Sequence, residues 1–184
     1  MTASFFAPFD PSVRSVRSGH SGGTAFRRAA AADAPALAAV EVAVRGSRPE
    51  SALAAMERAL GRGRTPLWLA EAGGTVVAYA KAAWLPTADD GGMSPEGFYL
   101  AGCTVLPGHR RRGLGRELTR LRLEWIARRA DEAWYFANAS NLSSLAMHVE
   151  FGFTEIRRGP LFHGVGFSGG EGVLLRARCG RIGG

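Results

Sequence analysis

The sequence predicts an α/β fold with a mixed β-sheet. Helical and strand-like periodicities follow one another in the order strand, two helices, three strands, helix, strand, helix and two strands. Because strands do not alternate regularly with helices, this order does not predict a doubly wound sheet. The length of 184 residues favours one domain, and the 46% of residues that are hydrophobic can form its core.

The first residues of the chain are polar and rich in Ser and Gly. We therefore expect a loosely ordered extension over residues 1–23, followed by a single domain over residues 24–184. Pro8, Asp10 and Pro11 interrupt the extension, which has no continuous apolar run, and this argues against a signal peptide.

The composition indicates a cytoplasmic protein. No stretch approaches the roughly 20 consecutive apolar residues that cross a bilayer, so we expect no membrane partner. Cys103 and Cys179 are the two cysteines, and neither belongs to a CxxC motif or a His-rich cluster. We therefore expect reduced thiols, with no disulfide and no metal site.

The N-terminal part of the domain predicts a strand and two helices. The strand is expected at Ala25–Ala30. Asp33 is a plausible N-cap for a helix that runs to about Val44, with Pro35 early in its first turn. Apolar residues at helical spacing predict a second helix at about Glu50–Leu60.

Three strands are expected next. Pro66–Glu71 and Thr75–Leu85 flank a Gly-Gly pair, which predicts a hairpin. Residues 86–95 carry turn residues and predict a loop. Gly97–Val105 is apolar almost throughout, which is typical of a central strand.

The remaining elements alternate between helix and strand. The longest helix is expected at Gly113–Ala130, a strand at Ala133–Ala137 and a shorter helix at Asn141–Phe151. Two closing strands, Phe153–Arg157 and Val173–Arg178, are separated by a Gly-rich turn.

Positive charge is concentrated in one part of the chain. The formal net charge is +7, and nearly all of the positive charge is arginine because Lys81 is the only lysine. Arginine-rich, alanine-rich and glycine-rich composition is typical of a GC-rich bacterial genome. Eight arginines nevertheless lie between Val105 and Ala130, which favours a polyanionic ligand such as nucleic acid or a phosphorylated cofactor.

The turn before the longest helix has the features of a pyrophosphate site. The first N–H groups of a helix have no backbone partners, and the helix dipole favours negative charge there. Gly113 and Gly115 remove side chains that would keep a phosphate away from the backbone. The neighbouring cations are Arg110, Arg111, Arg112 and Arg116.

Two nucleotide-binding motifs do not fit this turn. Gly108 and Gly113 have the spacing of a P-loop, but Leu114-Gly115 occupies the place of the required Lys-Ser or Lys-Thr. The run that begins at Gly113 also starts like GxGxxG, but Leu118 stands at the third glycine position.

With these motifs, the sequence resembles the GNAT superfamily of N-acetyltransferases. The acetyl-CoA motif of that family, Arg/Gln-x-x-Gly-x-Gly/Ala after a strand ending in Val-x-Pro, is matched by Val105-Leu106-Pro107 and by Arg110 to Gly115. The downstream Asn-x-x-Asn, helix and Gly-Phe pattern is matched by Asn138 to Asn141 and by Gly152-Phe153. The resemblance covers about residues 24–178. It implies a mostly antiparallel sheet of about six to seven strands flanked by about four helices.

The resemblance also implies a cofactor, acetyl-CoA, and the residues that hold it. Main-chain groups of the central strand would pair with the pantetheine arm, in an opening that needs a β-bulge near the end of that strand. The implied residues are Cys103, Thr104 and Val105 beside the pantetheine, Arg110, Arg111, Arg112, Gly113, Leu114, Gly115 and Arg116 around the pyrophosphate, and Asn138 and Asn141 with Ser143 or Ser144 on the far side of the cleft.

The implied reaction is direct attack of an amine on the thioester, with the N–H of Val105 as a candidate donor to the oxyanion. His148 stands where many relatives have a tyrosine that protonates the CoA sulfur, and it either takes that role or only hydrogen-bonds within the cleft. The general base is open between Glu96 and Glu71. The remaining histidines carry no spacing signal.

The expected acceptor is a primary amine of a small molecule or peptide. The family places the acceptor pocket at about residues 44–56, 84–95 and 163–171, and the acidic loop there favours a cationic amine. Two rival functions stay open: a regulatory domain that binds acyl-CoA without catalysis, and an Arg-rich nucleic-acid-binding module, which the lack of interleaved aromatic residues disfavours. Either a monomer or a homodimer is compatible with the sequence.

Overall fold

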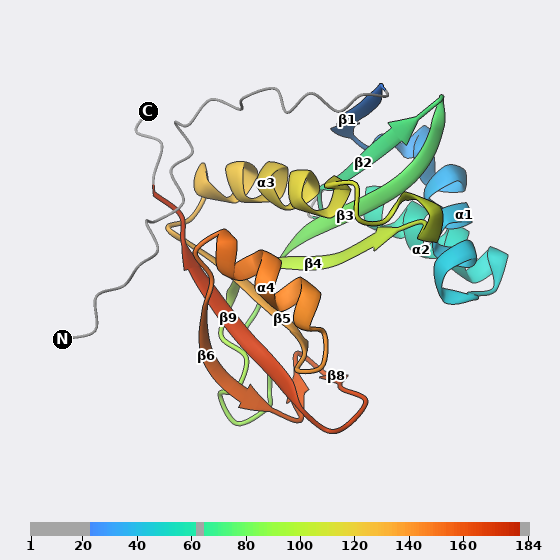
Figure 1. Ribbon diagram of the computed structural model, residues 1–184. Helices are drawn as coiled ribbons and strands as arrows, with labels where there is room; N and C mark the ends of the chain where they lie inside the picture. Colours follow the sequence, from blue (N-terminus) through green and yellow to red (C-terminus); the bar gives the residue numbers. More distant parts are fainter. Residues whose placement is uncertain (1–22, 62–64, 181–184) are drawn as a thin grey trace. The chain divides into compact units, whose positions relative to one another are not determined.

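The computed structural model describes residues 23–61 and 65–180 (Figure 1). The predicted extension therefore lies outside the described residues, apart from Gly23. The helices are η1 (Ala31–Asp33), α1 (Ala34–Arg45), α2 (Pro49–Gly61), η2 (Pro107–His109), α3 (Leu114–Ala127) and α4 (Leu142–Glu150), where η marks a short 3₁₀ helix. The strands are β1 (Thr24–Arg28), β2 (Leu67–Ala72), β3 (Thr75–Leu85), β4 (Gly97–Val105), β5 (Glu132–Asn138), β6 (Thr154–Gly159), β7 (Leu161–Phe162), β8 (Val165–Gly166) and β9 (Gly172–Arg178).

The predicted fold class is confirmed. The strands of the main sheet follow the order β1-β2-β3-β4-β5-β9-β6, and β7 and β8 form a separate two-stranded sheet. The pairs β1–β2, β2–β3, β5–β9 and β6–β9 are antiparallel, while β4 and β5 are parallel with Tyr99 opposite Trp134. The sequence did not predict β7 and β8, because strands of two residues are too short to show a period.

The contacts within the chain divide it into two compact units. The described part of unit 1 comprises residues 84–100 and 123–180, and that of unit 2 comprises residues 23–61, 65–83 and 101–122. Each unit is described by itself below.

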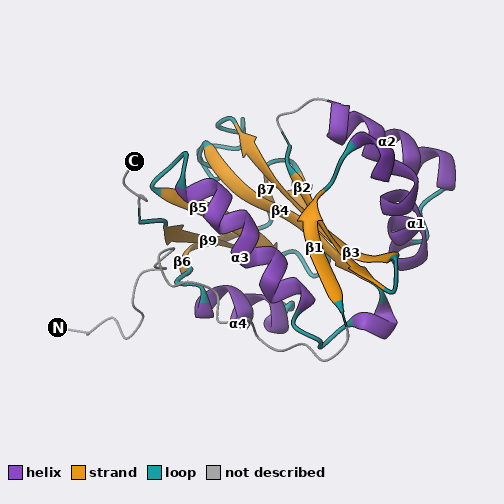
Figure 2. Ribbon diagram, turned by 90° about the horizontal axis from the view of Figure 1, so that it is seen from above, coloured by secondary structure: helices purple, strands orange, loops and turns teal. Residues whose placement is uncertain are grey.

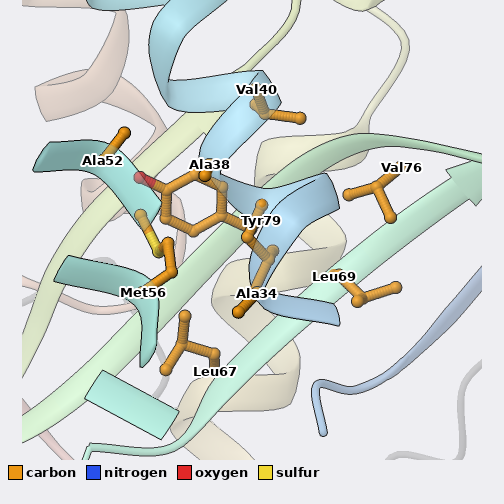
Figure 3. Packing of buried hydrophobic residues seen from close by; sticks show 10 residues of the cluster. Ala34, Ala38, Val40, Ala52, Met56, Leu67, Leu69, Val76 and Tyr79 are labelled. Carbon is orange, nitrogen blue, oxygen red and sulfur yellow. The ribbon is translucent and has the colours of Figure 1, made fainter. Parts of the chain in front are cut away.

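The core of unit 2 joins its two N-terminal helices to its strands. In Figure 2, α1 and α2 lie side by side next to β1, β2 and β3. Leu37 and Leu69 are fully buried in this cluster, and Figure 3 shows Ala38, Met56 and Tyr79 in it from α1, α2 and β3. The helices therefore contribute the apolar face that their 3.6-residue spacing predicts.

One buried phenol carries a polar contact into this core. The hydroxyl of Tyr79 donates a hydrogen bond to the carboxylate of Glu41 on α1. Burial, and then this bond to a carboxylate, raise the pKa of Tyr79 above its usual value, so the phenol stays neutral. The bond ties β3 to α1 through a satisfied polar pair.

Unit 1 is built around a three-stranded antiparallel ribbon in which β9 lies between β5 and β6 (Figure 1). Successive side chains of β5 point to opposite faces of the sheet. Trp134 and Phe136 join an aromatic cluster with Tyr99 and Phe162 on one face. On the other face, Tyr135 stacks against α4, as described below.

A buried arginine links α3 to β3 in unit 2. The side chain of Arg122 is only 1% exposed. Its Nε donates to the Leu118 carbonyl at 3.0 Å and a terminal nitrogen donates to Thr119 Oγ1 at 2.8 Å, while the other approaches the carbonyl of Lys81 at 3.4 Å. A buried guanidinium is stable only if such acceptors satisfy it.

We expect Arg122→Ala to lower the free energy of unfolding by about 2–4 kcal/mol, because it creates a cavity and leaves buried acceptors without a donor. Arg120→Ala is the matched control on the same helix, since Arg120 is partly exposed and pairs with Glu117 at the surface. Its loss should cost less than about 1 kcal/mol. Urea denaturation measures both, and equal losses would contradict the structural role of Arg122.

Candidate functional site

The predicted anion-binding turn lies in unit 2, between β4 and α3. After Leu106 donates its N–H to the Val77 carbonyl at 2.9 Å, the short helix η2 leads into Arg110. Arg111 has φ 61° and Gly113 has φ 78°. Left-handed residues within a short segment turn successive N–H groups toward one concave side, which is the arrangement of an anion-binding nest.

The start of α3 adds further donors to this turn. The first helical bond from α3 to the turn runs from the N–H of Glu117 to the Gly113 carbonyl at 3.0 Å. The N–H groups of Leu114 and Gly115 precede that bond, and the first N–H groups of a helix have no intrahelical acceptor. They are available to an anion at the positive end of the helix dipole.

Exposed guanidinium groups surround the turn. Arg110, Arg111 and Arg112 are all exposed. The Nε of Arg110 donates to the Val105 carbonyl at 3.3 Å, which holds its side chain back along β4. The turn thus offers backbone N–H groups and guanidinium groups, and none of these residues carries a carboxylate. Such a set of donors fits a pyrophosphate.

The last residues of β4 also belong to unit 2. Cys103 is exposed, Thr104 is buried and Val105 is half-buried, so the strand presents part of its edge and face to solvent. Gly102 has φ 71° within the strand, the conformation of the glycine in a G1 bulge. This conformation supports the expected irregularity near the end of the central strand.

The second group of predicted cofactor residues lies in unit 1. The side chain of Asn138 at the end of β5 is used internally: its Nδ2 donates to the Ser168 carbonyl and hydroxyl at 2.6 and 3.0 Å. Its Oδ1 accepts from the N–H and hydroxyl of Ser140 at 2.9 and 2.7 Å. Asn138 therefore fixes the entry to α4 and the loop around Ser168, and a cofactor contact through its side chain stays a prediction.

Residues at the start of α4 are the remaining members of this group. Asn141 is the N-cap of α4, and Asn141 and Ser143 are both exposed. Ser144 is half-buried, and its hydroxyl lies 2.7 Å from that of Tyr135. The contact with β5 distinguishes Ser144 from its neighbour Ser143.

His148 is enclosed by aromatic rings. Its imidazole stacks on Tyr135 with ring centroids 3.6 Å apart and meets Phe153 edge-on at 5.3 Å. Its Nδ1 lies 2.8 Å from the Ser144 carbonyl, and the residue is 2% exposed. If Nδ1 carries the proton and donates it to this carbonyl, Nε2 is left as an acceptor. The acid role of His148 stays a prediction.

The two candidate bases occupy different surroundings. Glu96 is exposed and lines a cavity of about 620 Å³ in unit 1, at the ends of the strands where β4 and β5 begin. Trp84, Arg129 and Arg178 are among the other lining residues. Asn138 lies at the opposite end of β5 from this cavity, about 20 Å away along a strand of that length.

Glu71 is committed to an ion pair in unit 2. Arg27 binds both Glu71 and Asp33 at 2.7 Å. The Asp33 bond and then the Glu71 bond raise the pKa of Arg27 above its usual value. This geometry gives Glu71 a structural partner that its position in the sequence did not reveal, because Arg27 is 44 residues away.

One titratable residue was not singled out from the sequence. His163 lies in the turn between β7 and β8 and contacts Tyr99 on β4 and Phe136 on β5. No local spacing could have revealed it, since its partners are 64 and 27 positions away. The only local signal is the following Gly164, which marks a turn.

Comparisons with known proteins agree with these features. The model of the acetyltransferase (GNAT) family matches residues 34–153.

No curated protein sequence matches the chain. None of the helices in the described part of the chain is long and apolar enough to span a membrane.

Solved structures share the fold over most of their length. Ribosomal-protein-alanine N-acetyltransferase from Brucella melitensis is 26% identical, with a TM-score of 0.64, and the match covers 84% of this chain and 99% of that one. The ribosomal-protein-S18-alanine N-acetyltransferase from Escherichia coli is 18% identical, with a TM-score of 0.65 and coverage of 88% and 97%. An acetyltransferase from Salmonella typhimurium, solved with its cofactor acetyl-CoA, is 22% identical, with a TM-score of 0.65 and coverage of 88% and 97%.

The left-handed glycine of the turn can be tested by its ligand affinity. Gly113→Ala should weaken the binding of CoA roughly tenfold, because a Cβ in the left-handed region costs about 1–2 kcal/mol and the turn will relax away from the nest. Gly108→Ala is the matched control, since Gly108 has open space around it and no positive φ. Calorimetric titration with CoA measures both dissociation constants, and equal values would contradict the nest.

Proposed function

Since the chain belongs to the acetyltransferase (GNAT) family, we propose that it is an acetyl-CoA-dependent N-acetyltransferase that acts on a primary amine by direct attack. The observation that carries the proposal is the turn between β4 and α3, where Arg111 and Gly113 are left-handed, because such residues are typical of an anion-binding nest. The fold shared with an N-acetyltransferase and with a protein solved with its cofactor acetyl-CoA supports it.

The residues of the turn would hold the diphosphate of the cofactor. The N–H groups of residues 113–115 supply fixed donors, and exposed Arg110, Arg111 and Arg112 supply mobile positive charge. Main-chain groups of Cys103, Thr104 and Val105 would bind the pantetheine arm, as the family resemblance implies. Asn141, Ser143 and Ser144 stay predicted cofactor residues of α4. When bound, the cofactor supplies an acetyl thioester whose carbonyl carbon accepts the amine nitrogen.

The proposed reaction also requires two proton transfers, one from the ammonium form of the acceptor and one to the CoA thiolate. A primary amine is nucleophilic only when neutral, so a base must remove a proton from the ammonium form, and we retain Glu96 for that role. The departing thiolate needs a proton, and we assign its donation to His148. With Nδ1 bonded to the Ser144 carbonyl, the ring carries a proton on Nε2 only as imidazolium, so the thiolate would take the Nε2 proton and leave the neutral ring.

The acceptor is a small-molecule or peptide amine. The named activity of the Brucella and Escherichia neighbours, on alanine of ribosomal proteins, supports a peptide amine as one candidate. The acidic side chains Asp89, Asp90 and Glu96 precede β4 and favour a cationic acceptor. The free thiols of Cys103 and Cys179 fit the reducing cytoplasm, where we expect the enzyme to act.

The central experiment follows the release of free CoA thiol. The protein is incubated with acetyl-CoA and a panel of amines: peptides with a free α-amine, polyamines and aminoglycosides. Thiol release that depends on one amine supports the enzyme. Protection against thermal melting by acetyl-CoA without turnover on any amine would favour the binding-only domain, and salt-sensitive binding to polynucleotide without such protection would favour the nucleic-acid module.

His148 is tested by replacing it with alanine and with tyrosine. Removal of a general acid should lower kcat by about 10²–10⁴-fold in His148→Ala, whereas His148→Tyr should retain more activity because a phenol can also donate a proton. The kcat values of wild type and both variants are compared at several pH values, because the ordinary pKa values of an imidazole and a phenol differ, at about 6.5 and about 10. Wild-type kcat in His148→Ala at every pH would refute the role.

A further inference from the structure

The hairpin of β7 and β8 depends on an unusual residue in its turn. The two residues between the strands, His163 and Gly164, have φ 47° and 74°. Positive φ at both central residues is the requirement of a type I′ turn, in which Asn-Gly is strongly preferred. Histidine tolerates this region better than most residues, but asparagine would satisfy it better. The geometry of the turn alone therefore does not explain why histidine stands at position 163.

The backbone of His163 is anchored to the loop before β4. Its N–H donates to the hydroxyl oxygen of Ser94 at 2.8 Å, and Ser94 is fully buried. The Ser94 hydroxyl donates in turn to Asp90, whose other oxygen accepts from the N–H groups of Met93 and Ser94 at 2.9 and 3.1 Å. These bonds hold the hairpin to the loop at one point.

The imidazole makes a second attachment, to the aromatic cluster of unit 1. Its ring meets Tyr99 edge-on, with centroids 4.6 Å apart and an interplanar angle of 83°. It also lies 6.1 Å from the ring of Phe136 at 28°. Its Nε2 is buried and has no hydrogen-bond partner among the residues that the structure describes. Burial of this nitrogen disfavours the charged ring, while Asp90 and the Pro95 carbonyl favour it.

We propose that His163 is a proton-sensitive latch, which holds the β7–β8 hairpin on Tyr99 and Phe136 while its imidazole is neutral and releases the hairpin when the imidazole is protonated. The edge-on contact with Tyr99 favours the neutral ring because the ring sits among aromatic side chains rather than water. On release, the imidazolium gains water, and the hairpin remains attached by buried Phe162 and by the hydrogen bond from the His163 N–H to Ser94.

The charged and titratable groups around the ring support this direction. Burial lowers the pKa of His163, while Asp90 and the carbonyl of Pro95 act in the opposite direction. Tyr99 contributes no charge, because burial raises its pKa above the usual value and its hydroxyl donates to the Pro95 carbonyl at 2.7 Å. Arg157, the cation nearest the loop, donates to the Gly92 carbonyl at 2.9 Å.

The sign of the pH dependence follows from linkage. The released hairpin binds a proton with an ordinary histidine pKa of about 6.5, and the latched hairpin binds it only at lower pH. Above about pH 6.5 the imidazole is neutral in both forms and the latch is at full strength. As the pH falls below that value, the released form gains protons first and the latch weakens.

The test is amide hydrogen exchange of the segment that contains the hairpin, in wild type and in His163→Asn, at several pH values from 8 to 5. Asparagine preserves the left-handed turn but cannot titrate. Since both proteins are compared at the same pH, the ratio of their protection factors cancels the chemical pH dependence of exchange. We expect wild-type protection to exceed that of the variant at pH 8 and to fall several-fold relative to it by pH 5.

Two further variants separate the latch from general effects on folding. His163→Phe keeps an aromatic ring against Tyr99 without a titratable group, so its protection relative to His163→Asn should not change with pH. Val165→Ala, in the same hairpin but 47% exposed, should keep the wild-type transition. A wild-type ratio that is constant from pH 8 to 5, or a His163 proton resonance that titrates while the hairpin amides stay unchanged, would overturn the latch.

The consequence for acceptor binding rests on the proposed function. The hairpin lies in the segment where the family resemblance places the acceptor pocket, so the ratio of the wild-type KM for the amine to that of His163→Asn should rise below about pH 6.5. The ratio cancels the protonation of the amine itself, which is common to both proteins. The exchange experiment needs no acceptor and decides the latch by itself. Absence of transfer to any amine would overturn the proposed function, while an unaltered ratio of KM values in an active enzyme would overturn the link between latch and acceptor.

Discussion

The N–H groups at the start of α3 impose the constraint on which the proposed chemistry depends. A helix cannot satisfy its own first donors, so the chain must present them to water, to a cap or to a ligand. None of residues 106–113, which lead into α3, is acidic. The turn contains left-handed residues at Arg111 and Gly113, which direct additional donors to the same side. The same backbone constraint explains why glycine stands at position 113 and why the surrounding side chains are cationic.

In unit 1, His148 and His163 contact residues on opposite faces of β5. Tyr135 and Phe136 are adjacent in β5 and therefore point to opposite faces. His148 stacks on the first, and His163 approaches the second. Both imidazoles contact aromatic rings of β5, and burial lowers the pKa of His163. A single strand thus carries one candidate proton donor and one pH-sensitive contact on separate sides.

The sequence predicted elements that are specified locally and missed contacts that are not. The hairpin at Gly73 and Gly74 and the anion-binding turn depend on neighbouring residues, so their patterns could be recognised. Glu71 could not be distinguished from Glu96 as a base, because the pairing with Arg27 joins β2 to β1 across 44 positions. The hydrogen bond from Asn138 to Ser168 could not be predicted for the same reason, because it joins residues 30 positions apart. The sequence therefore missed long-range side-chain partners rather than the positions of helices and strands.

The choice of arginine in the turn has a consequence for self-modification. A lysine beside an acetyl donor is itself an acceptor, because its amine has a neutral form that can attack, and acetylation would remove its charge. A guanidinium stays protonated at every physiological pH and offers no such nucleophile. Arg110, Arg111 and Arg112 would therefore bind the diphosphate of an acetyl donor without becoming acetylated. Lys81 is the one side chain of the whole sequence on which such a side reaction would leave an acetyl-lysine.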